Sequence, residues 1–178
     1  MGLLLRILHR DTFGYGLVYT EENIREVLNK ILEPPLALFS LQVQNRKNHA
    51  LIEISLDHLD HKTGSVSLFD CEEVSKRLKE ELDLWGEEFD FTLQVSSSGA
   101  ERLLRMPEDL DRFQGLLAKL EVLLENGNWD KRVYRLGPRM GDTIELTPYD
   151  NKGPRRKVVK PIQKPLSEIR KGNLFLEL

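Results

Sequence analysis

The sequence reads Phe91-Thr92-Leu93-Gln94-Val95-Ser96-Ser97-Ser98-Gly99 near the middle of its 178 residues. Apolar and polar side chains alternate over residues 89–96, which is typical of a strand with one buried face. The serines and the glycine that follow are typical of a turn. Because the pattern changes character after this turn, the two sides of the chain predict different architectures.

On the N-terminal side, residues 21–96 predict a helix, two strands, a second helix and the strand already described. Apolar residues recur at helical spacing from Glu21 until Pro34-Pro35 ends the first helix. Ser67 and Asp70 have capping-box spacing at the start of the second helix, which runs to about Leu84. The order predicts an α+β layer pair, with two helices on one face of a three-stranded sheet. The first two strands are expected over residues 36–44 and 51–56.

Residues 1–20 precede this pattern, and we interpret them as an N-terminal extension. Arg6 interrupts their apolar start and no cationic leader precedes it, so we expect neither a signal peptide nor a membrane span. The single cysteine, Cys71, lies on the buried stripe of the second helix and fits a reducing compartment. We therefore expect a cytoplasmic protein without membrane contact.

On the C-terminal side, residues 98–178 predict a short helix followed by an all-β unit. The helix is expected over Met106–Phe113, with Pro107 at its first position. Short apolar stretches then alternate with turns, one of which is Gly137-Pro138. Five short strands predict a small closed barrel, because closure leaves few exposed edges. These strands are expected over residues 116–124, 129–136, 143–146, 157–161 and 173–178.

The formal charge of −3 is the sum of two halves of opposite sign. Residues 1–97 hold 10 Lys/Arg against 17 Asp/Glu, whereas residues 98–178 hold 16 against 12. Clustered cations favour phosphate backbones through counterion release, and a solvated loop is the other interpretation of such a cluster. If the basic half contacts RNA, the acidic half is expected to meet a basic protein instead. The predicted RNA or partner contacts are Ser97, Ser98, Gly99, Arg102, Arg105, Lys152, Arg155, Arg156, Lys157 and Lys160.

The turn at residues 97–99 allows two interpretations when it is taken with Arg102. Its backbone amides and the guanidinium could hold a phosphate or a carboxylate of a partner. Alternatively, the turn is a connector between two domains and Arg102 forms an internal ion pair. The residues themselves leave both interpretations open.

Signals for enzymatic chemistry are weak. His58 and His61 could bind a divalent metal, but a catalytic zinc site needs three convergent ligands, and a polar loop is the simpler interpretation. The serine turn lacks the nucleophile elbow Gly-x-Ser-x-Gly, and neither phosphate-binding glycine motif is present. We expect no catalytic residue, metal or cofactor, with a metal enzyme at the two histidines as an alternative.

Three segments, at residues 70–76, 91–102 and 106–115, resemble in order and spacing the ribosome maturation factor RimP family. The chain is identified as a divergent member of that family. The family pattern has prolines at the positions of Ser98 and Leu103, and their replacement predicts a less rigid junction. The central motif matches at Ser96, Ser97, Gly99, Arg102 and Leu104, and departs at Gln94, Ser98, Ala100, Glu101 and Leu103.

The resemblance implies an N-terminal α/β domain over residues 21–97 and an SH3-like (Sm-like) barrel over residues 98–178. It also implies a non-catalytic role in maturation of the 30S small ribosomal subunit. Members are thought to act on pre-30S particles, with 16S rRNA and a small-subunit ribosomal protein as contacts, and we expect a monomer. The alternative is a free-standing regulator that binds RNA through its barrel.

Overall fold

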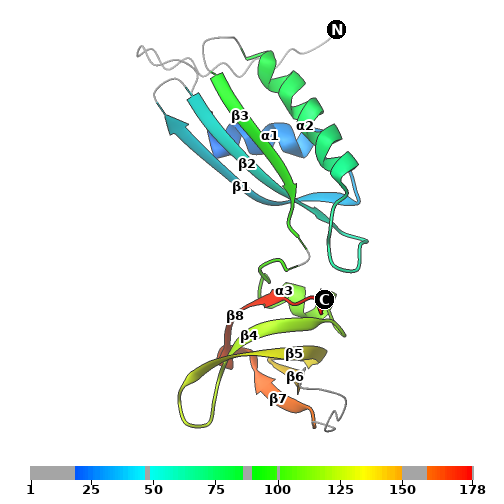
Figure 1. Cartoon of the computed structure of the whole chain (residues 1–178), viewed down its shortest axis with the longest axis vertical. Coiled ribbons are helices and arrows are strands. Elements are labelled where there is room, and N and C mark those ends of the chain that lie inside the picture. The colour runs from blue at the N-terminus through cyan, green and yellow to red at the C-terminus, as the bar shows by residue number, and fades with distance from the viewer. Residues whose placement is uncertain (1–18, 47–48, 86–89, 100, 150–159, 178) are drawn as a thin grey trace.

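The computed structural model describes residues 19–46, 49–85, 90–99, 101–149 and 160–177. It contains two sheets, one before and one after the serine turn (Figure 1). We refer to residues 19–99 as the N-terminal region and to residues 101–177 as the C-terminal region. The elements of the N-terminal region are α1 (Glu21–Ile31), β1 (Leu36–Arg46), β2 (His49–His58), α2 (Leu68–Asp83) and β3 (Asp90–Ser97).

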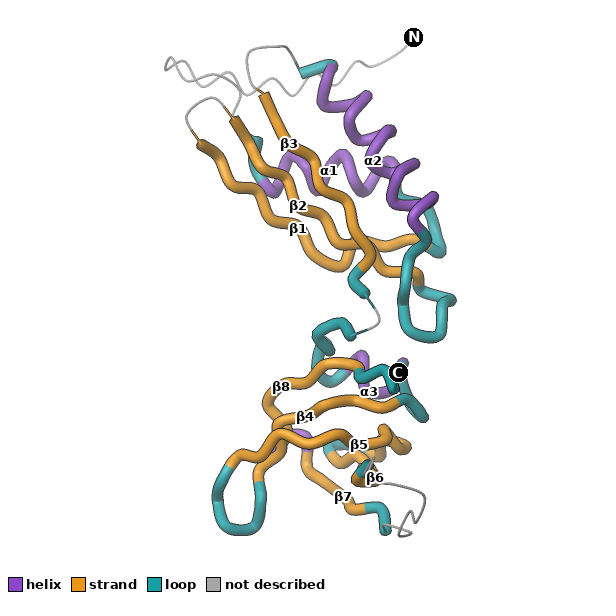
Figure 2. Tube along the Cα trace, in the orientation of Figure 1, coloured by secondary structure: helices purple, strands orange, loops and turns teal. Residues whose placement is uncertain are grey.

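The N-terminal region has the sheet order β1-β2-β3. β1 and β2 pair antiparallel, whereas β2 and β3 pair parallel. A parallel pair needs a crossover connection, and α2 supplies it. Both helices lie on the same side of the sheet in Figure 2, and the predicted pair of helices on a three-stranded sheet is confirmed.

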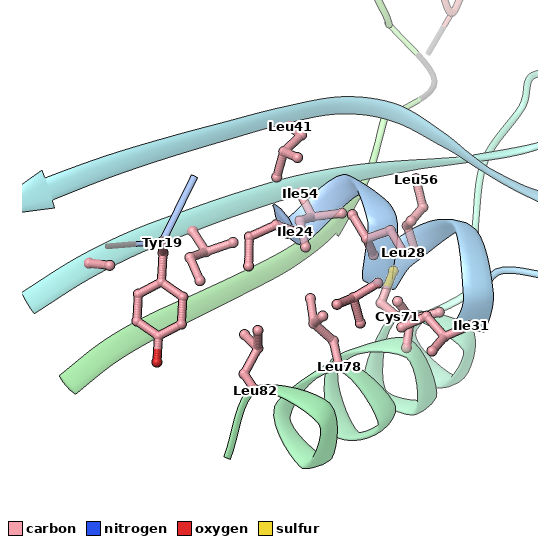
Figure 3. Packing of buried hydrophobic residues seen from close by; sticks show 14 of the residues in the cluster. Tyr19, Ile24, Leu28, Ile31, Leu41, Ile54, Leu56, Cys71, Leu78 and Leu82 are labelled. Atoms are coloured by element: carbon pink, nitrogen blue, oxygen red, sulfur yellow. The ribbon is translucent and has the colours of Figure 1, made fainter. Parts of the chain in front are cut away.

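Side chains from α1, α2 and the sheet meet in one hydrophobic cluster (Figure 3). Thr20 caps α1 by accepting a hydrogen bond from the Asn23 amide, and Ser67 caps α2 in the same way from Asp70. Tyr19 is buried and stacks on Trp85, with 5.7 Å between the ring centroids. Tyr19 and Thr20 thus contribute to core and cap, while residues 1–18 lie outside the described residues. The helices bury Ile24, Val27, Leu28, Ile31, Cys71, Val74, Leu78 and Leu82.

The C-terminal region has one antiparallel sheet in the order β7-β6-β5-β4-β8. A second hydrophobic cluster lies on its inner face and is separate from the first. Among the described residues β7 and β8 are not paired with each other, so the closed SH3-like barrel stays a prediction. The elements are α3 (Glu108–Arg112), β4 (Leu117–Leu123), β5 (Trp129–Met140), β6 (Thr143–Pro148), β7 (Ile162–Pro165), the 3-10 helix η1 (Leu166–Glu168) and β8 (Ile169–Leu174).

The turn predicted at Gly137-Pro138 is wrong, because β5 continues through it to Met140. The pairing with β6 shifts register between Leu136 and Arg139, which places the two residues in a bulge. A Cβ atom on Gly137 would lie 2.8 Å from the Glu145 carbonyl oxygen, so the bulge requires glycine. A bulge also tolerates proline, which has no amide proton for the ladder.

The last two strands are displaced from their predicted positions. β7 begins at Ile162, and the preceding Lys160 and Pro161 are not in a strand, while residues 157–159 of the predicted strand lie outside the described residues. β8 begins at Ile169, before the predicted 173–178, and it includes Gly172. A Cβ atom on Gly172 would lie 2.3 Å from Leu120 Cδ2, so this glycine permits close approach of β8 to β4. The sequence pattern misleads here because a glycine usually weakens a strand.

The predicted short helix is present, but Pro107 occupies its N-cap position and the helical residues begin at Glu108. The helix buries Leu110 against the second cluster and places Asp109 and Arg112 beside the N-terminal region. It therefore helps to position the junction described next.

Candidate functional site at the junction of the two sheets

The serine turn after β3 is held by hydrogen bonds within the N-terminal region. Ser97 Oγ accepts from the Val66 amide at 3.0 Å and from the Gly99 amide at 3.2 Å. The Ser98 amide donates to the Leu56 carbonyl at 2.7 Å. Gly99 has a φ of +78°, a conformation that favours glycine. The amides of Ser98 and Gly99 are thus engaged in fixing where the chain leaves β3.

Arg102 follows this turn and its side chain is fully buried. Its Nη1 lies 2.6 Å from Asp57 Oδ1, and its Nη2 lies 3.7 Å from Asp109 Oδ2. The guanidinium also lies 4.2 Å from the centre of the Phe39 ring and 5.3 Å from that of Phe113. The internal ion pair considered for Arg102 is therefore present, and aromatic faces of both regions surround its charge.

Phe39 reaches Arg102 because β1 contains a bulge. The register of β1 with β2 pairs Leu38 with Leu56 and Ser40 with Ser55, which leaves Phe39 as the extra residue. A bulge redirects the side chain that it contains, and here the ring faces Arg102 and Arg105 of the C-terminal region.

Asp57, near the end of β2, receives two further arginines. Arg112 donates from Nη1 to Asp57 Oδ2 at 2.6 Å and from Nη2 to Oδ1 at 3.0 Å, a bidentate pair. Arg105 donates to Oδ2 at 3.4 Å. One carboxylate of the N-terminal region thus contacts three arginines of the C-terminal region. We call Asp57, Arg102, Arg105, Asp109 and Arg112 the junction cluster.

Docking of the C-terminal region buries Asp57. In β2, the side chains of Ile52, Ile54 and Leu56 point into the first hydrophobic cluster, so by alternation Asp57 lies on the opposite face. The Asp57 side chain is nevertheless only 1% exposed, because the arginines cover it. A buried carboxylate needs such partners, and removal of one partner of a buried pair typically costs about 3–5 kcal/mol. The cluster therefore links the two regions.

Acid is expected to weaken this link. Burial alone raises the pKa of Asp57, but hydrogen bonds from Arg112 and Arg102 and their charges lower the pKa below its ordinary value of 3.8. Since the folded pKa is the lower one, the stabilising contribution is complete above the unfolded pKa and is lost as pH falls through the folded pKa.

The test measures the free energy of unfolding of the wild type and of Asp57→Asn in urea, from about pH 7 to about pH 2.5. The difference between them should be constant near neutrality and should shrink below about pH 4. A difference that stays constant over the whole range would contradict the assignment.

The structure brings together half of the predicted contact residues. Ser97, Ser98, Gly99, Arg102 and Arg105 lie at the junction, and the Arg105 side chain is 49% exposed at its rim. Lys160 is exposed in the segment before β7. Lys152, Arg155, Arg156 and Lys157 lie outside the described residues.

Sequence reasoning missed Asp57, Asp109 and Arg112 as site residues. Asp57 continues the alternation of β2 on its polar face, which by itself does not indicate a buried carboxylate. The available signal was the recurrence of arginine at positions 102, 105 and 112, close to the turn that joins the halves. Three arginines alone do not indicate a buried ion pair, because their acceptor, Asp57, lies 55 residues before Arg112 in the chain.

Of the two histidines considered as metal ligands, His61 has a structural role in the loop after β2. His61 Nδ1 accepts hydrogen bonds from the Thr63 and Ser65 amides at 3.3 and 3.2 Å, which folds the loop after β2. Within the described ranges, no group of three His, Cys, Asp or Glu side chains is arranged to hold a metal ion. In those same ranges, no helix combines the length and the apolar character that crossing a membrane requires.

Fold and junction together define a protein that joins an α+β layer pair to a five-stranded antiparallel sheet through a buried ionic cluster. Residues 27–101 match the family model of the RimP N-terminal domain.

Two relatives are similar over most of the chain, and both are named ribosome maturation factor RimP. The one from Leptospira biflexa serovar Patoc (strain Patoc 1 / Ames) is 73% identical over 162 residues, which is 91% of this chain and 100% of that relative. The one from Leptospira interrogans serovar Lai (strain 56601) is 42% identical over 163 residues, again 91% of this chain and 100% of that relative. The chain therefore belongs to the ribosome maturation factor RimP family, and the resemblance seen in the sequence is confirmed.

Proposed function

We propose that this chain is a non-catalytic ribosome maturation factor that assists assembly of the 30S small subunit in the cytoplasm. It binds pre-30S particles through 16S rRNA and a small-subunit ribosomal protein. The observation that carries this proposal is the 73% identity to a ribosome maturation factor RimP along that relative's whole length. The opposite charges of the two halves support a protein with two different contacts.

The charges suggest which region makes which contact. The basic C-terminal region, proposed to be an SH3-like barrel domain from residue 98 onward, lies against rRNA. The acidic N-terminal domain, residues 21–97, carries Glu and Asp along α1 and α2 and lies against a basic ribosomal protein. The junction cluster holds the two contact surfaces of one monomer in a defined relation.

The cations at the rim and in the segment before β7 are the proposed phosphate contacts. Arg105 and Lys160 are accessible in the structure, whereas Lys152, Arg155, Arg156 and Lys157 enter the proposal from the sequence. Arg102 acts as a positioning residue here, because its charge is buried against Asp57. Ser97, Ser98 and Gly99 direct the chain between the two contact surfaces.

Sedimentation of a cell extract on a density gradient tests the proposal. The protein should co-migrate with immature small subunits, and high salt should release it, since phosphate contacts weaken as salt rises. Absence from ribosomal fractions, together with retained binding to short RNA strands, would exclude the proposal and favour a free-standing RNA-binding regulator.

Charge reversal tests the basic segment. The triple variant Arg155→Glu, Arg156→Glu and Lys157→Glu should weaken co-migration about 10-fold or more, because three attractions to phosphate become repulsions. The matched control reverses three cations of α2, Lys76, Arg77 and Lys79. It should not weaken co-migration, because it only adds negative charge to the region proposed to meet a basic protein. Circular dichroism verifies that both variants are folded. Equal co-migration of the first variant and the wild type would remove the segment from the interface.

A further inference from the structure

The outer face of β5, β4 and β8 carries a basic surface that the junction does not use. Residues directly opposite each other in an antiparallel ladder point to the same face. In β4, Leu120 and Val122 point into the second hydrophobic cluster, so Lys119 and Glu121 lie on the outer face. Their cross-strand partners include Lys131 on β5 and Lys171 on β8, and Leu123 pairs with Trp129.

An exposed tryptophan lies at one end of this surface. Trp129 is 38% exposed, and the Arg170 guanidinium carbon lies 4.7 Å from the centre of its ring. Arg170 Nε donates to Glu121 Oε2 at 2.6 Å, which fixes the guanidinium while leaving its side chain 53% exposed. The guanidinium that lies over the indole is thus fixed in place by a carboxylate.

The surrounding charges are predominantly positive. Lys119 and Lys131 are exposed, and the Lys171 side chain is 60% exposed with Nζ 3.3 Å from Glu121 Oε1. Hydrogen bonding by Arg170 lowers the pKa of Glu121, so this carboxylate is ionised near neutrality. It balances only part of the positive charge that Lys119, Lys131, Arg170 and Lys171 contribute. We call Lys119, Glu121, Trp129, Lys131, Arg170 and Lys171 the platform face.

We propose that the platform face binds single-stranded RNA, with a base stacked on the Trp129–Arg170 pair and neighbouring phosphates held by Lys119, Lys131 and Lys171. Sequence-tolerant binding of single strands combines a basic surface with aromatic or guanidinium planes on which bases stack, and both parts are present here. The inference rests on the proposed function and adds the RNA-binding surface to it.

The partially exposed indole of Trp129 favours single-stranded RNA over an acidic protein as the ligand of the platform face. A chain of carboxylates would be attracted by the lysines, but it would gain little from a planar pair at the end of the surface. A nucleotide contributes both a base that stacks on the pair and a phosphate that the lysines attract. Stacking is therefore the property that the experiment must separate from charge.

Tryptophan fluorescence makes this separation, because the chain has two tryptophans, one in each region. Trp85 packs on Tyr19 in the N-terminal region. The variant Trp85→Phe therefore leaves Trp129 as the only source of tryptophan emission. Oligouridine of about 12 nucleotides should quench the emission of this variant. Heparin, a polyanion without bases, should compete for the lysines without quenching. Equal quenching by heparin and RNA, or quenching by neither, would overturn the inference.

Charge-conserving variants provide the second test, by fluorescence anisotropy of labelled oligouridine. Arg170→Lys keeps the charge but removes the plane, and it should weaken binding at least about 5-fold, the lower end for one stacked base. The matched control Arg139→Lys changes an arginine that pairs with Asp111 elsewhere on the sheet and should leave binding unchanged. An unchanged affinity of Arg170→Lys would reduce the surface to a charged patch and overturn the stacking assignment.

The outcomes also separate this inference from the proposed function. If oligouridine fails to bind while the protein still co-migrates with immature subunits, RNA binding by the platform face is excluded and the maturation role is retained. If oligouridine binds with quenching while the protein is absent from ribosomal fractions, RNA binding by the platform face is supported and the maturation role is excluded.

Discussion

Asp57→Ala is expected to lower the free energy of unfolding by about 3–5 kcal/mol, the range for breaking a buried ion pair by removing one partner. The variant leaves the fully buried guanidinium of Arg102 without its 2.6 Å contact, and Arg112 without its bidentate acceptor. Asp109 remains 3.7 Å from Arg102, too far to replace the lost pair. Unfolding in urea, followed by the fluorescence of Trp85 and Trp129, measures the loss in both regions.

Asp111→Ala provides the matched control for this experiment. Asp111 also pairs with an arginine, Arg139, but its side chain is 47% exposed. Solvent screens exposed pairs of this kind, so the control should change stability little. Equal losses in Asp57→Ala and Asp111→Ala would show that burial at the junction has no energetic consequence, which would contradict the role given to the cluster.

Gly64→Ala is expected to destabilise the protein by about 3 kcal/mol or more, through two separate effects. Gly64 has a φ of +74°, where an alanine costs about 1–2 kcal/mol. A Cβ atom there would also lie 2.4 Å from Arg102 Nη1 and 2.5 Å from Asp57 Oδ1. The methyl group would therefore separate the buried pair in addition to straining the backbone.

Gly127→Ala isolates the backbone effect. Gly127 has a similar φ of +79°, but a Cβ atom there would meet no atom within 4 Å. Gly127→Ala should therefore lower the free energy of unfolding by only about 1–2 kcal/mol. In the Asp57→Ala background, Gly64→Ala should cost less than it does in the wild type, because the pair that it separates is already absent. Additive losses in the double variant would contradict a shared mechanism.

The N-terminal region was largely predictable because its signals are local. The helical spacing after Glu21 and the cap at Ser67 depend on residues within a few positions of one another. The apolar face of each helix must pack against a sheet, and the alternating segments predict the strands of that sheet. The predicted and observed bounds of α1 and α2 therefore nearly coincide.

Predictions in the C-terminal region failed where tertiary packing overrides a local signal. Gly137-Pro138 has turn composition, yet β6 pairs with β5 on both sides of it and converts it into a bulge. Gly172 weakens a strand in isolation, yet it lies in β8 because Leu120 occupies the space that a side chain would need. Neither neighbour can be identified from the local pattern.

Four features can be inferred from residue order alone: the α+β order, the change at the serine turn, the charge split between the halves and the family resemblance. Tertiary packing, in contrast, makes Arg102 internal and pairs it with Asp57. The same packing brings Trp129 and Arg170 together on one surface. These contacts join residues that lie tens of positions apart in the chain. Whether a charge is buried or exposed depends on which distant segment covers it, and that is determined only when the two regions pack together.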